Sequence, residues 1–171
     1  MTRCGRTRRL LVWLVLTWAG LGGATPARAD GWGGITPGAT TRREVEGRYG
    51  RPTRERAVTE GGRTGTEWTY AGDRAPQGLD RLVVGFGLLR GGRFEADVVR
   101  GLALHAKPRV FTVQAITNGW GTPDAIGTDQ ATGRPAFRYD AKGLLIILDQ
   151  TGEWAEILLF APQRPATKPP S

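Results

Sequence analysis

Apolar and polar residues along the chain follow two periods, one typical of helices and one typical of strands. In EVEGRYG (44–50), Val45 and Tyr49 are spaced i,i+4, and in AITNGWG (115–121) Ile116 and Trp120 repeat that spacing, so each stretch carries a narrow apolar stripe. The segments EWTYAG and AFRYDA that follow alternate aromatic and polar residues, which is the period of a strand. The pattern predicts two short helices, each leading into strands, with Tyr49 and Trp120 in equivalent core sites.

The ends of both helices are marked by local signals. Thr41 with Glu44 three residues later fits a capping box, in which hydroxyl and carboxylate each satisfy a free backbone N–H. Each helix is followed by Gly-X-Pro, at 50–52 and at 121–123. We expect each glycine to adopt the left-handed conformation after the last turn, and each proline to prevent continuation.

These signals form part of a longer internal repeat. Thr41 matches Thr112 and Gly50 matches Gly121 at one offset, 71 (112 − 41 and 121 − 50). Further on, LVVGF (82–86) matches LLIIL (144–148), and GRFEADVV from 92 matches GEWAEILL from 152. Matches in unbroken order indicate a duplicated unit, with copies at about 35–101 and 106–161 joined by RGLALHAKPR.

The predicted fold class is α+β. Each copy is expected to be an α-βββ unit, and the two tandem units are expected to pack their helices on antiparallel sheet. One unit alone would bury too little surface to be stable, so residues 30–161 are expected to form one compact domain.

The first 29 residues are interpreted as a cleaved signal peptide. MTRCGRTRR is basic, the run from Leu10 to Leu21 is apolar but short for a membrane span, and Ala27-Arg28-Ala29 fits a cleavage site. Cys4 precedes the apolar run, so it cannot act as a lipidation site after it, and the mature chain would hold no cysteine. Residues 162–171, rich in proline, are expected to be a disordered tail.

The net charge changes once this leader is set aside. The whole chain carries a formal +8, but five of its 24 basic residues lie in the leader, which leaves 19 (24 − 5) against 16 acidic residues. A formal +3 is too small for a nucleic-acid-binding surface. The mature protein is therefore not expected to bind nucleic acid. The cleaved leader predicts a periplasmic protein that is not lipidated and has no transmembrane segment. Peripheral association with the outer membrane, and a leader retained as an anchor, are the alternatives.

The stretch PGATTRREVEGRYGRP, followed by an aromatic-X-aromatic pair, LVVGF and a glycine-led last strand, resembles the SmpA/OmlA (BamE-like) domain family. That family comprises small envelope proteins, one of which is an accessory lipoprotein of outer-membrane β-barrel assembly. The two copies and the missing lipobox differ from that lipoprotein. A tandem of such units also resembles the β-lactamase inhibitor protein fold.

Candidate contact residues gather around the first helix. Arg42, Arg43, Arg48 and Arg51 are candidates for contact with a protein partner or anionic lipid headgroups, because guanidinium groups suit carboxylate and phosphate. The alternative is a solvated helix whose arginines pair with neighbouring glutamates. Trp32 and Trp154 are candidate interface aromatics, with core packing as the alternative.

No motif in the chain indicates catalysis, a cofactor or a metal. His105, the only histidine, has no nucleophile placed beside it by any motif, so a surface or linker role is expected. Glu95 and Asp97 are expected on a solvated strand face, with Phe94, Ala96 and Val98 inward.

The leading hypothesis is an exported, non-enzymatic periplasmic protein-binding module, such as an accessory factor of outer-membrane protein assembly or of envelope integrity. The alternative is a protein inhibitor of an exported enzyme.

Overall fold

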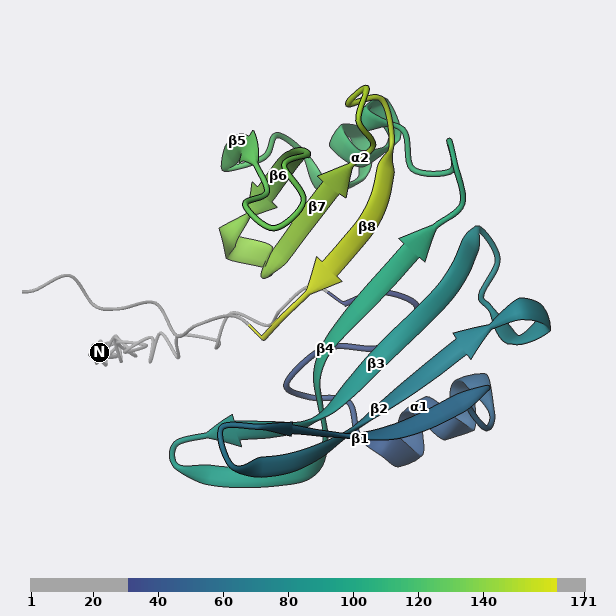
Figure 1. The fold of residues 1–171 in the computed structure, drawn as a ribbon, viewed down its shortest axis with the longest axis vertical. Helices are drawn as coiled ribbons and strands as arrows, with labels where there is room; N and C mark the ends of the chain where they lie inside the picture. The colour runs from purple at the N-terminus through teal and green to yellow at the C-terminus, as the bar shows by residue number, and fades with distance from the viewer. Residues whose placement is uncertain (1–30, 163–171) are drawn as a thin grey trace, which may run out of the picture.

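A computed structural model describes residues 31–162; the predicted signal peptide (1–29) and all of the predicted tail except Pro162 lie outside these residues. Strands dominate the described part, with two α-helices of eight residues each (Figure 1). In chain order the main elements are α1 (Arg42–Tyr49), β1 (Arg54–Glu60), β2 (Arg63–Ala71), β3 (Leu79–Arg90), β4 (Arg93–Ala106), α2 (Val113–Trp120), β5 (Ala125–Thr128), β6 (Pro135–Tyr139), β7 (Leu144–Leu148) and β8 (Ala155–Phe160). Two 3₁₀ turns, Gly72–Arg74 and Asp140–Lys142, follow β2 and β6.

All eight strands belong to one antiparallel sheet. Its order is β1-β2-β3-β4-β8-β7-β6-β5, so each half of the chain forms one half of the sheet and β4 meets β8 at the centre. Residues Leu102 to His105, which the sequence places at the junction of the copies, are the part of β4 that pairs with β8. The expected junction is therefore the central seam of the sheet.

The predicted fold class, two tandem α-βββ units with helices packed on antiparallel sheet, is wrong. The chain is mostly a single eight-stranded sheet, to which two short helices are added. Sequence reasoning missed the edge strands β1 and β5 because their residues do not alternate: β1 reads RERAVTE with mostly exposed side chains, and β5 has four residues. An edge strand pairs on one side only and needs no apolar face.

The helix boundaries follow the local signals closely. The side chain of Thr41 accepts from the Glu44 N–H and the Glu44 carboxylate accepts from the Thr41 N–H, so the capping box is confirmed. Gly50 and Gly121 end the helices with φ of 71° and 86°, but ψ of −163° in both. This is not the expected left-handed helical conformation. It is an extended region with positive φ that essentially only glycine adopts.

Each helix is tethered to the central strands in the same way. The Val99 N–H donates to the Thr40 carbonyl at 2.9 Å, and the Ala155 N–H donates to the Phe111 carbonyl at 2.7 Å. One residue later, Thr41 and Thr112 cap the two helices. The two halves thus attach their helices with matching backbone bonds.

The strand pairings correct the last part of the sequence alignment. Val84 of β3 faces Leu102 of β4, and Ile146 of β7 faces Leu158 of β8. Leu158 is therefore the counterpart of Leu102, whereas the sequence alignment equates it with Val98. The reason is that β3 and β4 run on into a hairpin arm, with 12 and 14 residues against five and six in β7 and β8.

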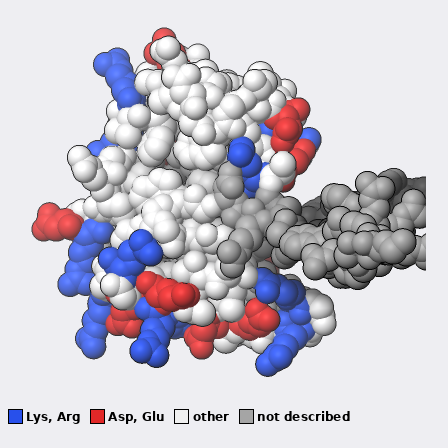
Figure 2. Space-filling model, turned by 180° about the vertical axis from the view of Figure 1, so that it is seen from behind, with Lys and Arg blue, Asp and Glu red and all other residues white. Residues whose placement is uncertain are grey.

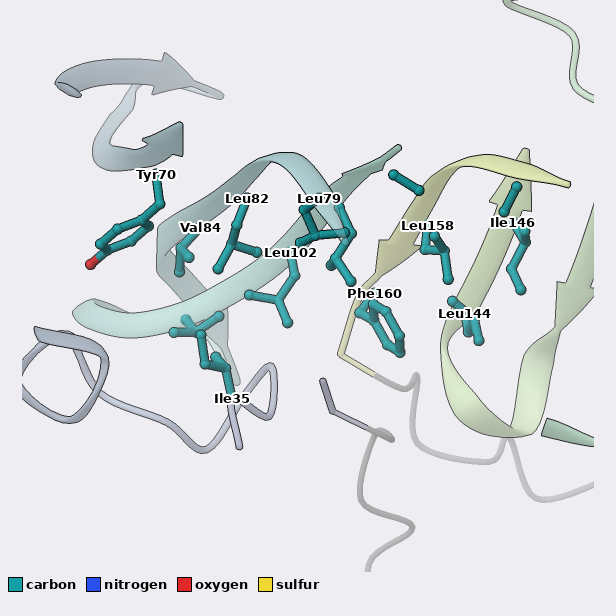
Figure 3. Packing of buried hydrophobic residues seen from close by; sticks show 14 of the residues in the cluster. Ile35, Tyr70, Leu79, Leu82, Val84, Leu102, Leu144, Ile146, Leu158 and Phe160 are labelled. Atoms are coloured by element: carbon teal, nitrogen blue, oxygen red, sulfur yellow. The ribbon is translucent and has the colours of Figure 1, made fainter. Parts of the chain in front are cut away.

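The core lies on one face of this sheet. Two rows of paired, buried side chains cross six strands and carry residues from both halves (Figure 3). One row contains Trp68, Val84, Leu102, Phe160, Leu144 and Tyr139, and the other contains Tyr70, Leu82, Leu104, Leu158, Ile146 and Phe137.

The helices and the segment before α1 cover this core face. Val45, Ile116 and Ile35 are fully buried in the same cluster. Tyr49 and Trp120, which we expected in equivalent core sites, are half-buried and pack against the edge of the cluster. Each apolar stripe therefore buries one residue fully and the other only in part.

Candidate functional site: the open face of the sheet

The two faces of the sheet are covered differently. Tyr49 of α1 contacts Tyr70 with ring centroids 5.7 Å apart, and Trp120 of α2 contacts Phe160 at 6.4 Å, so both helices lie against the core face. In Figure 1 the strands stand in front of both helices. The opposite side of the sheet carries neither α1 nor α2. We call this side the open face.

The centre of the open face is apolar. One row of paired residues runs from Thr69 through Val83, Ala103 and Leu159 to Leu145, and each of them is half-buried. Ile157 of β8 lies in the neighbouring row, beside His105. We call the four residues Val83, Ala103, Leu145 and Leu159 the apolar stripe. Because Ala103 pairs with Leu159 across the seam, the stripe is shared by both halves of the sheet.

Basic side chains flank the stripe on the first half of the sheet. There the open face is hollowed into a groove of about 410 Å³. Its lining residues come from four adjacent strands, β1 to β4: Arg54, Arg56, Glu67, Thr69, Arg81, Val83, Ala103 and His105. At the other end of the stripe, Leu145 faces Arg138 of β6.

The positive charge in this groove is only partly neutralised. Arg56 Nε donates to Glu67 Oε1 at 2.8 Å, and this hydrogen bond raises the pKa of Arg56. Among residues 31–162, neither Arg54 nor Arg81 forms an ion pair. Three arginines and one glutamate leave the lining with a formal +2.

His105 takes a defined role in the groove. Its Nδ1 lies 3.4 Å from Nη2 of Arg81, and because arginine can only donate, Nδ1 must accept and the proton of the neutral ring sits on Nε2. Burial lowers the pKa of His105, and the positive charge of Arg81 lowers it further, against a smaller opposing effect of Asp80. The imidazole is therefore neutral at pH 7 and holds Arg81 as an acceptor.

The first predicted contact residue, Arg42, is drawn into the structure. Its guanidinium carbon lies 5.0 Å from the ring centroid of Phe86 and 5.4 Å from that of Trp68. Its Nη1 lies 3.4 Å from a Glu55 oxygen, and its Nε lies 3.2 Å from an Asp97 oxygen, an ion pair that is not aligned as a hydrogen bond. Arg42 covers the core rather than facing a partner.

The other three predicted arginines, Arg43, Arg48 and Arg51, are exposed. None of them forms an ion pair within the described part of the chain. The Arg48 guanidinium lies over Gly34, while the Arg51 carbonyl accepts from Arg74. The four arginines therefore do not form one basic face.

Figure 2 views the molecule from behind, on the side of the helices. Charged groups of both signs gather over its lower part, where α1 and the first four strands lie, whereas the upper part is mostly uncharged. The surface around α1 is thus of mixed charge.

The predicted interface aromatics are both half-buried. Trp32 packs against the core and forms an isolated bridge with Ile35. Trp154 precedes β8 and bridges to Thr112, and the Arg109 guanidinium lies 5.6 Å from the centroid of its ring. The structure places the two tryptophans in different halves and does not bring them together.

The acidic residues of β4 are arranged differently from the expectation. Bulges in the β3–β4 pairing shift the register, so Val99 is the buried residue and Ala96 is exposed. Asp97 is exposed and paired with Arg42, while Glu95 is half-buried. Simple alternation fails here because each bulge inserts an extra residue.

Within residues 31–162 no cluster of three metal-binding side chains occurs. Over the same residues, no helix has the length and apolar content to cross a membrane.

Sequence reasoning missed the groove altogether. The available signal was weak: Arg54 and Arg56 are spaced i,i+2 and so share a strand face if that segment is a strand. Arg81 and His105 join them only through the pairing of β3 with β4.

No family model matches this chain, and no curated protein matches it either. Among solved structures it is similar to a DUF4309 family protein (YjgB) from Bacillus subtilis subsp. subtilis str. 168. The two chains are 15% identical, with a TM-score of 0.48 over 77% of this chain and 84% of that chain.

Proposed function

We propose that this protein is a non-enzymatic binding module and that it engages a protein partner through the open face of its sheet. The observation that carries the proposal is the unequal covering of the sheet. Both helices lie on the core face, while the apolar stripe on the other face is only half-buried and lies between arginines. An apolar centre with a polar rim is the usual anatomy of a protein interface.

The residue types of this face also suit a protein. Arginine is enriched at interfaces, and an apolar stripe of valine, alanine and leucine loses water when a partner covers it. The stripe crosses the central seam, so one partner would contact both halves of the molecule at once.

The compartment remains part of the proposal. A cleaved signal peptide at residues 1–29 would place the mature protein in the periplasm, where envelope proteins are the available partners. We also propose that the chain is a member of the SmpA/OmlA family, and the support for this is the sequence motifs around α1. Mass spectrometry tests the export step: the mature N-terminus is expected at Asp30, with no lipid attached.

Two roles fit such a module. As an accessory factor of outer-membrane protein assembly it would bind envelope proteins; as an inhibitor it would bind one exported enzyme. The inhibitor is the second candidate because the apolar stripe extends over both halves of one continuous sheet, and protease–inhibitor complexes bury about 800 Å² on each partner.

The test is site-specific crosslinking in cells that express the full chain. A photoreactive amino acid replaces Leu159 on the open face, and as a matched control it replaces Gln114, which is exposed on α2. A defined adduct is expected from position 159, and its loss is expected when Leu145→Asp is added. Equal adducts from both positions, or an adduct that survives Leu145→Asp, would contradict the proposal.

The identity of the adduct separates the two roles. An outer-membrane or assembly protein supports the accessory role. A soluble enzyme that forms a one-to-one complex and loses turnover supports inhibition.

Contact with anionic lipid headgroups through Arg43, Arg48 and Arg51 is a separate proposal. Flotation with anionic liposomes at low ionic strength tests it. Replacement of the three arginines by Gln is expected to abolish flotation, because each charge near such a surface contributes about 1 kcal/mol. Absence of flotation in the unmodified protein would end it.

A further inference from the structure

The groove beside the apolar stripe carries positive charge that its acidic side chain neutralises only in part. Arg56 is neutralised by Glu67. Arg54 and Arg81 form no ion pair among the described residues, although both line the same hollow. Both side chains are exposed, so water solvates them in the free protein, and a carboxylate that binds there would replace this water with charge-assisted hydrogen bonds.

The pairing of the strands places these two arginines on the same face of the sheet. Arg54 of β1 pairs with Thr69 of β2, which pairs with Val83 of β3, and Arg81 lies two residues before Val83 on the same strand. In a strand, residues two apart share a face. Arg54 and Arg81 therefore stand on either side of Thr69, with Thr69, Val83 and Ala103 lining the groove between them.

His105 orients one of the two. As a neutral acceptor it holds one amino group of the Arg81 guanidinium, which leaves the remaining N–H groups of Arg81 to donate elsewhere. A carboxylate accepts two parallel hydrogen bonds from such a fork, and this is the geometry in which arginine binds most strongly.

We propose that the groove is a carboxylate-binding site, in which Arg54 and Arg81 receive an aspartate or glutamate side chain of the protein that docks on the open face. The inference rests on the proposed function and specifies the chemistry of the partner. Val83 and Ala103 belong both to the groove and to the apolar stripe. A ligand that fills both must present a carboxylate beside apolar groups. A segment of a protein can present both.

Glu67 favours a carboxylate over a phosphate. Its side chain lines the same groove and is largely buried there, 17% exposed, so a doubly charged phosphate would meet more repulsion than a singly charged carboxylate.

Binding of a model acidic peptide tests the site directly. The probe is hexaglutamate, with hexaglutamine of the same length as the uncharged control and inorganic phosphate as the competing anion. Titration into the isotopically labelled protein is followed by NMR at low ionic strength, where attraction between charges is least screened. Hexaglutamate is expected to shift the arginine Nε–H signals of Arg54 and Arg81 and the amide of Thr69, and hexaglutamine to shift none of them.

Two double variants separate a site from general attraction. Arg54→Gln/Arg81→Gln removes the proposed ligands, and Arg43→Gln/Arg51→Gln removes the same charge from exposed arginines elsewhere. The first pair is expected to weaken hexaglutamate binding by roughly tenfold or more, since hydrogen bonds to charged groups are the strong ones. The second pair is expected to change it less than about twofold.

Three results would overturn the inference. The first is an equal loss of hexaglutamate affinity in both double variants. The second is NMR shifts at all exposed arginines. The third is phosphate that binds at Arg54 and Arg81 more tightly than hexaglutamate does. If the first double variant does not fold cooperatively, the single variant Arg81→Lys gives the answer, because it keeps the charge but loses the fork: affinity must fall.

Failure here is distinguishable from failure of the proposed function. Crosslinking from position 159 reports on the apolar stripe and does not need Arg54 or Arg81. If a partner crosslinks there but hexaglutamate does not bind in the groove, the open face stands as the interface and only the proposal of a carboxylate site fails.

Discussion

The hydroxyl of Tyr70 donates a hydrogen bond of 3.0 Å to the carbonyl oxygen of Gly50. In the second half of the chain Tyr139 makes the same bond, also 3.0 Å, to Gly121. Each tyrosine comes from the second strand after its helix and each glycine ends that helix. The unusual backbone conformation of the glycine thus directs its carbonyl to the hydroxyl of a tyrosine buried under the helix. Because both halves form this hydrogen bond, both contain Gly-X-Pro.

Replacing Gly50 by alanine should destabilise the protein by about 1–3 kcal/mol, because its φ of 71° and ψ of −163° are strained for any residue with a Cβ. No heavy atom lies within 4 Å of an added Cβ, so steric crowding does not contribute. Denaturant unfolding monitored by circular dichroism measures the change.

The matched control for this variant lies in the same helix. Gly47 also has nothing within 4 Å of an added Cβ, but it is helical. Gly47→Ala should therefore stabilise the protein by about 0.5–1 kcal/mol. Equal effects at positions 47 and 50 would show that the conformation of Gly50 is not what the structure describes.

Arg42 and Arg43 are adjacent in sequence and should respond differently to replacement by glutamine. Arg42→Gln loses the contacts with Trp68 and Phe86 and two ion pairs, so a loss of about 1–2 kcal/mol is expected. Arg43 is exposed, so Arg43→Gln should stay within about 0.5 kcal/mol of the unmodified protein. Thermal unfolding of both variants makes the comparison. Similar stabilities would place Arg42 in solvent.

Asp149 should make the stability of the protein depend on pH in acid. Its side chain is 4% exposed in the β7–β8 turn and accepts hydrogen bonds from Thr151, Glu153 and Trp154. Burial by itself would raise the pKa of Asp149, but these bonds outweigh it and lower the pKa to about 2. The ionised form is thus favoured by folding, so its contribution is complete above about pH 4 and is lost as the pH falls towards 2.

The variant Asp149→Asn isolates this effect. It should be less stable than the unmodified protein at neutral pH, because one amide oxygen replaces two carboxylate oxygens. The difference in unfolding free energy between the two proteins should shrink between about pH 4 and pH 2. A constant difference over that range would mean that Asp149 keeps its ordinary pKa.

His105 should titrate below its ordinary value of 6.5, because burial and then the charge of Arg81 lower its pKa. It is the only histidine of the chain, so its pKa is measured by NMR from the change of one imidazole resonance with pH. The neutral form is favoured by folding, so its contribution is present above about pH 6.5 and is lost as the pH falls through the lowered pKa. Arg81 and Asp80 of β3 are the charged groups that act on it, and Ile157 faces it from β8.

Removing the guanidinium should raise this pKa. Arg81→Gln is expected to move the titration of His105 back towards 6.5 without reaching it, since burial remains. Arg54→Gln is the control, because Arg54 lines the groove but is not hydrogen-bonded to His105. A larger effect of Arg54 than of Arg81 would refute the assigned contact.

Several elements were predictable from the sequence because their causes are local. A cap such as Thr41 acts within three residues, and Gly-X-Pro ends a helix through the backbone of the same few residues. The alternation around Trp68 and Tyr70 indicated that both lie on one face of a strand, and this face is the buried one. Matching signals at one offset also revealed the two halves of the chain.

The edge strands, the register of the last strands and the groove were not predictable in the same way. β1 has no apolar alternation, and the bulges between β3 and β4 shift which residues face inward. Arg54 and His105 lie 51 residues apart (105 − 54) and meet only because β1 to β4 are adjacent in the sheet. Arg42 was a candidate for partner contact, because its position beside Phe86 depends on the same pairing and no local pattern indicates it.

The sequence by itself determined where the helices begin and end, that Trp68 and Tyr70 share one strand face, and that the chain contains two related halves. The tertiary structure decided that these halves share one sheet, that both helices take the same face of it, and that Arg54, Arg81 and His105 gather on the other. The difference has one physical reason. Caps, glycine turns and alternation act between near neighbours, whereas pairing between strands joins residues far apart in sequence through hydrogen bonds whose partners no local pattern specifies.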